Sequence, residues 1–321
     1  MRFGNGHSPF PQETMRANLP SALLFLIPAV SLTAAPVIDD RALISGFEKG
    51  LGELADVGLP LVLKEARATL EELSDCVVTL PEGCGAIEVD EEAGLYASCI
   101  PAVVAVGTVY DCGHCDEWHL GGFATGWIAS ADGVVVTNYH VVDKDNDHLL
   151  GVMTPDGRVF PVVEVLTGNK AGDAAVLRID TGGESLPWLR LAPGAQVGEK
   201  VGVISHPRRR LFVYTQGVVS RFHTMPQRNA DGKAPVFMSI TADYAVGSSG
   251  GPVVNARGEV VGMVASTSTV TAGGSRNRSE GEDGDEEGAS PRRTPGAVQM
   301  VFKDSVSPQV LNALIQYGRG E

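Results

Sequence analysis

A serine set among small residues is the stretch of the sequence best suited to chemistry. The segment Val246-Gly247-Ser248-Ser249-Gly250-Gly251-Pro252 places Ser249 directly before two glycines and a proline. Those glycines allow a tight turn and a close approach of the backbone to a bound acyl group. The N–H groups of Gly247 and Ser249 would stabilise the oxyanion of an acyl-transfer intermediate. The alternative interpretation is that this stretch is only a Gly/Ser turn between two strands.

Residues able to activate such a serine occur upstream. A serine hydroxyl needs a histidine base, and the histidine needs a carboxylate that orients it. An apolar strand runs toward His140 within Val134–Val142, and Asp173 stands at the head of the apolar strand Ala174–Ile179. The order along the chain is therefore histidine, aspartate, serine.

The order and the flanks of these three residues resemble those of the trypsin-like serine proteases, most closely the bacterial HtrA-type branch. The resemblance runs from about Ala102 to the end of the chain. Further matching segments are Thr125–Ile128, Asp132–Gly133, Thr215–Ser220 and Val298–Ile315. The resemblance implies that His140 is the general base, Asp173 its orienting partner and Ser249 the nucleophile. It also implies an oxyanion hole formed by the N–H groups of Gly247 and Ser249.

The same resemblance suggests substrate-binding residues near the serine. In trypsin-like proteases an acid about six residues before the nucleophile can lie at the base of the P1 pocket, and Asp243 stands there. A turn-capping aspartate is the alternative for Asp243. The strand before the insert lines the substrate cleft in the family, which makes Val264 and Ser266 candidates. Ser248 replaces the Asp or Asn that commonly precedes the nucleophile, so activation by pairing a new N-terminus with an acid is not expected.

Short strands separated by turn residues follow Ala102. Pro155–Arg158 and Asn255–Gly258 each predict a hairpin, and regular short strands favour closed β-barrels. We therefore expect an all-β fold of two six-stranded antiparallel β-barrels, chymotrypsin-like, with the triad in the cleft between them. The protease domain is predicted at 101–318, with barrel 1 at about 101–190 and barrel 2 at about 198–304.

The N-terminal third is predicted to lie outside the protease domain. Residues 1–35 contain an apolar run too short to span a bilayer comfortably, followed by small residues, and are predicted to be a signal peptide. An uncleaved anchor is the alternative. Residues 36–100 are predicted to be a helical extension whose apolar face packs on the protease domain or serves an oligomer or partner interface. That face is expected to comprise Val62, Ala66, Leu70 and Leu73.

Two features are predicted near the C-terminus. Residues 268–297 are rich in Gly, Ser, Arg and acids, and we expect a disordered acidic insert that is either a tolerated insertion or a mobile flap. A closing helix capped by Ser307 should follow and stop at Gly318. Its inward face is expected to comprise Val310, Leu311, Leu314 and Ile315. We expect no PDZ domain after this helix.

Five cysteines precede the expected catalytic histidine: Cys76, Cys84, Cys99, Cys112 and Cys115. Export would permit disulfides, although an odd count leaves one thiol over. The Cys112-Gly113-His114-Cys115 spacing also suits a redox motif, or a partial metal site together with His119. A structural disulfide is the favoured interpretation, and no metal site is assigned.

These observations predict a secreted or periplasmic serine endopeptidase that hydrolyses peptide bonds in proteins through an acyl-enzyme, with no metal or organic cofactor required. The net charge of -14 argues against nucleic-acid binding. After signal removal no stable membrane span is expected. His206 is a rival for the base, but it lacks the strand-ending position of His140. The alternative functions are a catalytically latent peptide-binding or chaperone-type domain and, third, a redox protein built on Cys112 and Cys115.

Overall fold

Strands dominate the computed structural model, which describes residues 1, 37–81, 86–229, 231–271 and 297–318. The chain divides into Met1–Val37 and a second unit, Ile38–Glu321, to which the elements below belong. Apart from Met1, the predicted signal peptide lies outside the described residues. Within the described ranges, no helix has the length and apolar character needed to cross a bilayer.

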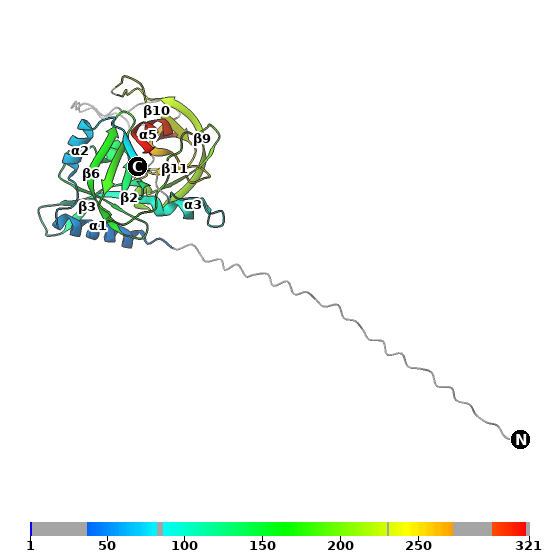
Figure 1. Cartoon of the computed structure of the whole chain (residues 1–321), viewed down its shortest axis with the longest axis horizontal. Coiled ribbons are helices and arrows are strands. Elements are labelled where there is room, and N and C mark those ends of the chain that lie inside the picture. Colours follow the sequence, from blue (N-terminus) through cyan, green and yellow to red (C-terminus); the bar gives the residue numbers. More distant parts are fainter. Residues whose placement is uncertain (2–36, 82–85, 230, 272–296, 319–321) are drawn as a thin grey trace. The chain divides into compact units, whose positions relative to one another are not determined.

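Six strands between Val103 and Ile179 close into an antiparallel barrel, here called barrel 1 (Figure 1). The hydrogen-bonded order around the barrel is β2-β3-β4-β7-β6-β5. The strands are β2 (Val103–Asp111), β3 (Trp118–Ser130), β4 (Val134–Thr137), β5 (Leu149–Met153), β6 (Val159–Asn169) and β7 (Ala174–Ile179). Every residue of β4 is buried, which explains its unbroken run of β-branched side chains.

A second six-stranded antiparallel barrel, barrel 2, follows between Lys200 and Val306. Its order is β10-β13-β12-β11-β8-β9. The strands are β8 (Lys200–Ser205), β9 (Val213–Thr224), β10 (Val236–Ile240), β11 (Pro252–Val254), β12 (Val260–Thr271) and β13 (Val298–Val306). The predicted all-β fold of two six-stranded barrels is thus confirmed, as are the hairpins β5–β6 and β11–β12.

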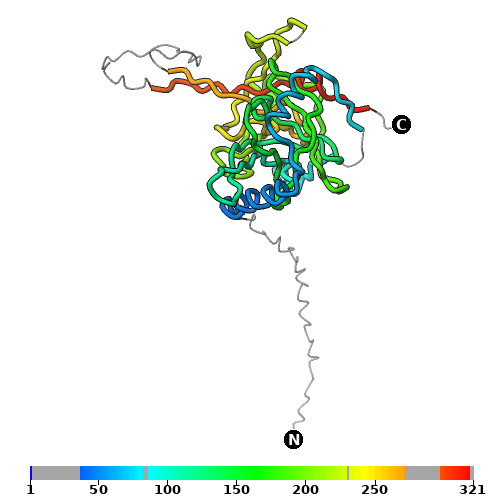
Figure 2. Tube along the Cα trace, turned by 90° about the vertical axis from the view of Figure 1, so that its left-hand side faces the viewer, coloured from blue at the N-terminus to red at the C-terminus, as the bar shows by residue number. Residues whose placement is uncertain are grey.

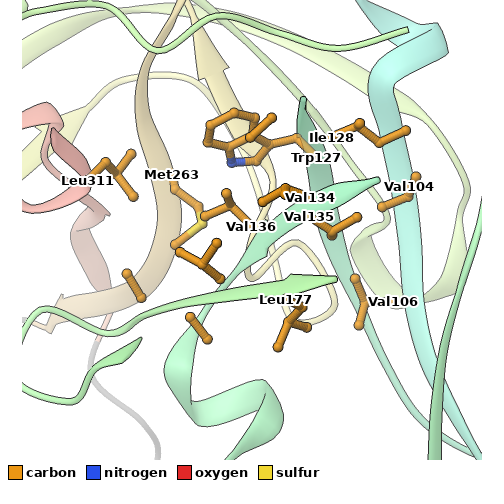
Figure 3. Close-up of a cluster of buried hydrophobic side chains, with 14 of the residues drawn as sticks. Val104, Val106, Trp127, Ile128, Val134, Val135, Val136, Leu177, Met263 and Leu311 are labelled. Carbon is orange, nitrogen blue, oxygen red and sulfur yellow. The ribbon is translucent and has the colours of Figure 1, made fainter. Parts of the chain in front are cut away.

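One hydrophobic core joins the two barrels. Trp127, Ile128 and Val136 of barrel 1 lie in the same buried cluster as Met263 of barrel 2 and Leu311 (Figure 3). Both tryptophan rings of this cluster, Trp127 and Trp188, are at most 1 % exposed. Large aromatic side chains bury more apolar area than any others, so this shared core fixes how loops from the two barrels meet.

The N-terminal extension contains the helices α1 (Asp40–Asp56), α2 (Leu63–Glu72) and α3 (Gly94–Cys99), the short 3-10 helix η1 (Ile100–Ala102) and the strand β1 (Val78–Pro81). α1 lies against barrel 1, where Phe47 and Leu51 are fully buried. Glycines on the barrel make room for them, because a Cβ at Gly107 would meet the Phe47 ring. At these positions the extension therefore packs on barrel 1.

The buried face of α2 differs in part from the predicted one. Leu63, Ala66 and Leu70 are buried, whereas Val62 and Leu73 flank the helix and are half-buried. Val62 instead forms a backbone bridge with Leu149 of β5, which pulls it out of the helix. The prediction that Val62 and Leu73 belong to the helical face was therefore wrong.

The closing helix is shorter than predicted. α5 (Pro308–Leu314) follows Ser307 and buries Val310, Leu311 and Leu314. Ile315 does not continue the helix but begins β14 (Ile315–Gly318), which pairs in parallel with β1. The assignment of Ile315 to the helix was wrong, because pairing with Val78, more than two hundred residues away, draws it into a strand.

The strands that flank the predicted acidic insert form one long hairpin. β12 and β13 pair from Met263↔Val306 out to Thr271↔Val298 and run together away from the barrels (Figure 2). Residues 266–270 of β12 are exposed. The residues between Thr271 and Ala297, which include most of the predicted insert, lie outside the described residues, so its disorder stays a prediction.

Candidate active site

The end of β4 positions His140. Asn138 precedes the short helix α4 (Tyr139–Val142), and its side-chain amide donates to the Asp173 carbonyl (2.8 Å). His140 Nδ1 lies 2.9 Å from Oδ2 and 3.0 Å from Oδ1 of Asp173, and the His140 backbone N–H donates to Oδ1 (3.1 Å). A carboxylate only accepts hydrogen bonds, so the proton of a neutral His140 stays on Nδ1. Nε2 is then free to act as a base.

The turn between β6 and β7 positions Asp173. This residue has φ +55°, in the left-handed region that aspartate tolerates better than most side chains. Its side chain is 23 % exposed, against 49 % for His140. The carboxylate thus lies behind the imidazole, and the histidine edge faces solvent.

Ser249 lies in the loop between β10 and β11. The flanking glycines both have positive φ, +95° at Gly247 and +86° at Gly250. A Cβ at Gly247 would lie 2.6 Å from the His206 carbonyl oxygen, and a Cβ at Gly250 would collide with the Thr125 carbonyl. Glycine is therefore required at both positions, which explains the Gly-Ser-Ser-Gly pattern.

Some backbone N–H groups of this loop donate hydrogen bonds to backbone carbonyls of the described residues, and others do not. The N–H of Ser248 donates to the Ala245 carbonyl, that of Gly250 to Val264 and that of Gly251 to Ser248. Within the described part of the chain, the N–H groups of Gly247 and Ser249 donate to no backbone carbonyl. These are the two donors that sequence reasoning assigned to an oxyanion hole.

Thr125 of β3 ties the serine loop to barrel 1. Its N–H donates to the Ser249 carbonyl (2.8 Å) and its hydroxyl donates to the Gly247 carbonyl (2.9 Å). From barrel 2, the Ser205 hydroxyl donates to the Ser248 hydroxyl (3.0 Å). Sequence reasoning identified neither Thr125 nor Ser205 as a support, because both contact the serine loop from strands far away in the sequence and nothing in their local pattern signals this.

A pocket of about 290 Å³ brings the candidate residues together. His140, Gly247 and Ser249 all line it. Leu63 of α2 also lines it, so the N-terminal extension supplies part of the wall, which the sequence did not predict. The other lining residues are mainly apolar or small: Val106, Gly107, Thr108, Gly122, Phe123, Ala124, Val141, Lys144, Asn146, His148, Leu150 and Val246.

The three candidate substrate-binding residues lie in different environments. Ser266 lines a second pocket together with His140 and Asp173. Val264 is 1 % exposed and reaches the serine loop through its backbone, accepting from the N–H of Gly250. The Asp243 side chain is 82 % exposed and its carboxylate pairs with Lys303 (2.5 Å). Asp243 lines neither pocket that contains His140, so its role at a P1 pocket stays a prediction.

His206, the rival base, is fully buried. Its Nδ1 accepts a hydrogen bond from the Phe212 N–H (3.0 Å), and its ring meets Phe212 and Phe123 edge-on. Burial lowers the pKa of His206 to about 4, and a backbone hydrogen bond to Val104 only partly opposes the shift. His206 is therefore a neutral packing residue beneath the serine loop.

The buried His206 predicts a loss of stability in acid. An unfolded histidine binds its proton near pH 6.5, but the folded His206 binds it only near pH 4. Protons therefore favour the unfolded chain across this window, at about 1.4 kcal/mol per pH unit. Urea unfolding at pH 7.0 and 5.0 should show a smaller pH dependence for His206→Gln than for the wild type. Equal pH dependence of the two proteins would contradict this role.

Gly247→Ala should impair the site more than the fold. The new Cβ meets the His206 carbonyl and the residue must keep a positive φ, so the loop must shift. A displaced oxyanion donor costs about 10²–10³ in kcat. Gly194→Ala is a matched control, because its Cβ would meet nothing within 4 Å. Peptide-hydrolysis kinetics and melting curves of the two variants check this; equal kcat values would refute it.

Among the described cysteines, Cys76, Cys99, Cys112 and Cys115 are all free thiols. The favoured disulfide is therefore not present in this part of the chain. Burial raises the pKa of the Cys99 thiol to about 11. Cys112 Sγ and Cys115 Sγ lie 3.2 Å apart, and His119 Nε2 lies 3.0 Å from Cys115 Sγ. A hydrogen bond from the His114 backbone, followed by one from the Cys115 side chain, lowers the pKa of the Cys112 thiol to about 7.

Comparison with known proteins shows that this site is similar to those of known serine proteases. Residues 124–263 match the model of the trypsin-like peptidase domain. HhoA of Synechocystis, whose name assigns it to the serine proteases, is 32% identical over 150 residues, which are 46% of this chain and 37% of that protein. The mitochondrial serine protease HTRA2 of Bos taurus is 35% identical over 157 residues, 46% of this chain and 32% of that protein.

The HTRA2 protein of Drosophila grimshawi gives a longer match, with 30% identity over 189 residues, 56% of this chain and 43% of that protein. The chain thus spans less than half the length of the curated relatives it matches. The matched region includes His140, Asp173 and Ser249. On the family model and these relatives, residues 124–263 resemble a trypsin-like peptidase domain, and the chain is similar to serine proteases of the HtrA branch.

Proposed function

We propose that the protein is a serine endopeptidase that uses His140, Asp173 and Ser249. One observation carries the proposal: Asp173 holds the imidazole of His140 at Nδ1, and His140 shares a pocket with Ser249 and Gly247. That arrangement leaves the opposite edge of the imidazole for the serine hydroxyl. Similarity to the trypsin-like peptidase domain and to serine proteases supports the same chemistry.

In the proposed mechanism, Nε2 of His140 accepts the hydroxyl proton as Ser249 attacks the peptide carbonyl. The N–H groups of Gly247 and Ser249 hold the negative oxygen of the tetrahedral intermediate. His140 then gives its proton to the leaving amine, and an acyl-enzyme forms. A water molecule deprotonated by His140 hydrolyses it. Asp173 stays ionised and stabilises the imidazolium throughout.

The pocket beside Ser249 suggests a substrate preference. Its wall contains Val106, Phe123, Leu150 and Leu63. Besides His140 and Ser249, its polar side chains are Thr108, Lys144, Asn146 and His148. Apolar walls favour apolar side chains because binding removes both surfaces from water. We propose that the site takes protein substrates with an apolar residue next to the cleaved bond.

Cleavage mapping tests this function. Unfolded substrate proteins are incubated with wild type and with His140→Ala, and the new termini are identified by mass spectrometry. Internal cleavage by the wild type alone, blocked by a serine-directed phosphonate, is expected, with apolar residues enriched beside the cut. Cleavage that persists in His140→Ala, or that the phosphonate leaves unchanged, would exclude this mechanism.

We further propose that the protein is exported, secreted or periplasmic, through residues 1–35. N-terminal sequencing of the protein recovered from the producing cell tests this. A mature chain beginning near Pro36 is expected, and an intact residue-1 terminus on a cytoplasmic protein would oppose it.

A further inference from the structure

A cluster of metal-ligating side chains lies on barrel 1, outside the proposed active site. Cys112, Cys115 and His119 offer two sulfurs and one imidazole nitrogen that all lie within 4.8 Å of one another. Cys112 and Cys115 belong to the tip of the β2–β3 hairpin, and His119 lies on β3. None of the three lines the pocket that contains Ser249.

The hairpin register sets this arrangement. Tyr110 of β2 pairs with His119, and Asp111 pairs with Trp118, so the intervening loop must fold back over the end of β3. Gly113 takes φ +69° in the turn, and its N–H donates to the Asp111 carboxylate (2.7 Å). This returns Cys115 toward the strand, where its sulfur lies 3.0 Å from His119 Nε2.

The distances suit a shared ion better than a disulfide. A disulfide needs two sulfurs about 2.05 Å apart and makes no use of a histidine. Tetrahedral zinc, with its usual bond lengths, separates its ligand atoms by about 3.5–3.8 Å. The observed separations of 3.2 Å and 3.0 Å require only a small outward movement of the side chains, of which Cys115 is exposed and Cys112 and His119 are half-buried. Thiolate and imidazole ligands together favour zinc over magnesium or calcium.

The local charge also favours a cation. Asp111, Asp116 and Glu117 surround the cysteines in the sequence. We propose that Cys112, Cys115 and His119 bind one Zn²⁺, with solvent as the fourth ligand, and that the ion links the hairpin tip to β3. This proposal differs from the sequence-based prediction, which assigned no metal site.

Metal titration tests this proposal independently of proteolysis. Protein expressed from the full chain is reduced, stripped with a chelator, desalted and titrated with Zn²⁺ against a chromophoric competitor. Wild type should bind one ion per chain, and Co²⁺ should give thiolate charge-transfer and tetrahedral d–d bands. Cys115→Ser and His119→Gln should each lose the stoichiometric binding and the bands.

Cys76→Ser is the matched control, because Cys76 is another exposed thiol, outside the hairpin. It should bind zinc like the wild type, and so should Ser249→Ala, whatever its effect on peptide cleavage. Circular dichroism confirms that each variant is folded. The proposal is overturned if reduced wild type binds no zinc, if both cluster variants bind as tightly as wild type, or if the native protein is isolated with a Cys112–Cys115 disulfide and no metal.

Discussion

Ser249→Ala is expected to lower kcat for peptide hydrolysis by about 10⁶. The substitution removes the attacking oxygen and keeps the backbone N–H groups of Gly247 and Ser249. A residual rate about 10³–10⁴ above the uncatalysed reaction can therefore remain, from oxyanion stabilisation and binding alone. KM should change little, since the pocket walls are untouched. Fluorogenic peptides chosen from the cleavage map supply the measurement.

The fold should tolerate Ser249→Ala. Ser249 is half-buried at the pocket surface, and its backbone carbonyl, which accepts from the Thr125 N–H, is retained. The melting temperature should therefore match that of the wild type. A fall in kcat of less than tenfold in a folded variant would mean that a residue other than Ser249 is the attacking nucleophile.

Asp173→Asn is expected to lower kcat by about 10⁴. An amide can donate to Nδ1 of His140, which moves the imidazole proton to Nε2, and Nε2 can then no longer accept the serine proton. Asparagine suits this position because it tolerates the φ of +55° that Asp173 adopts. The substitution therefore changes the hydrogen-bond role of the side chain while the turn is preserved.

Asp132→Asn provides the control for Asp173→Asn. Asp132 is also a barrel 1 carboxylate, but it pairs with Arg178 on the surface and lines neither pocket that contains His140. The Asp132→Asn variant should have the same kcat as the wild type. If Asp173→Asn and Asp132→Asn gave the same kcat, Asp173 would have no part in orienting the base.

The candidate site was largely predictable because each part has a local signature. The β-branched run before His140 predicts a buried strand, and the glycines around Ser249 predict a turn that only glycine can make. Asp173 stands at the head of a strand that is likewise recognisable by its apolar run. The sequence alone did not reveal the distances between these residues, and the structure supplies the contact between His140 and Asp173.

The predictions that failed depend on partners far away in the sequence. Ile315 looks helical by periodicity, but strand pairing with Val78 determines its conformation. Leu63 lines the pocket because α2 packs on barrel 1, and no local sequence pattern predicts that packing. The position of His119 beside Cys115 likewise follows from the β2–β3 register, so the spacing of the cysteines left a disulfide, a metal and a redox motif open.

Whether Ser249 is an activated nucleophile is tested most directly by covalent labelling with a fluorophosphonate, read by intact mass. The folded wild type should gain one probe per chain, whereas Ser249→Ala, His140→Ala and heat-unfolded wild type should gain none. Peptide mapping should place the adduct on Ser249. A folded wild type that stays unlabelled, or a Ser249→Ala variant that labels as fully as the wild type, would contradict the proposed mechanism.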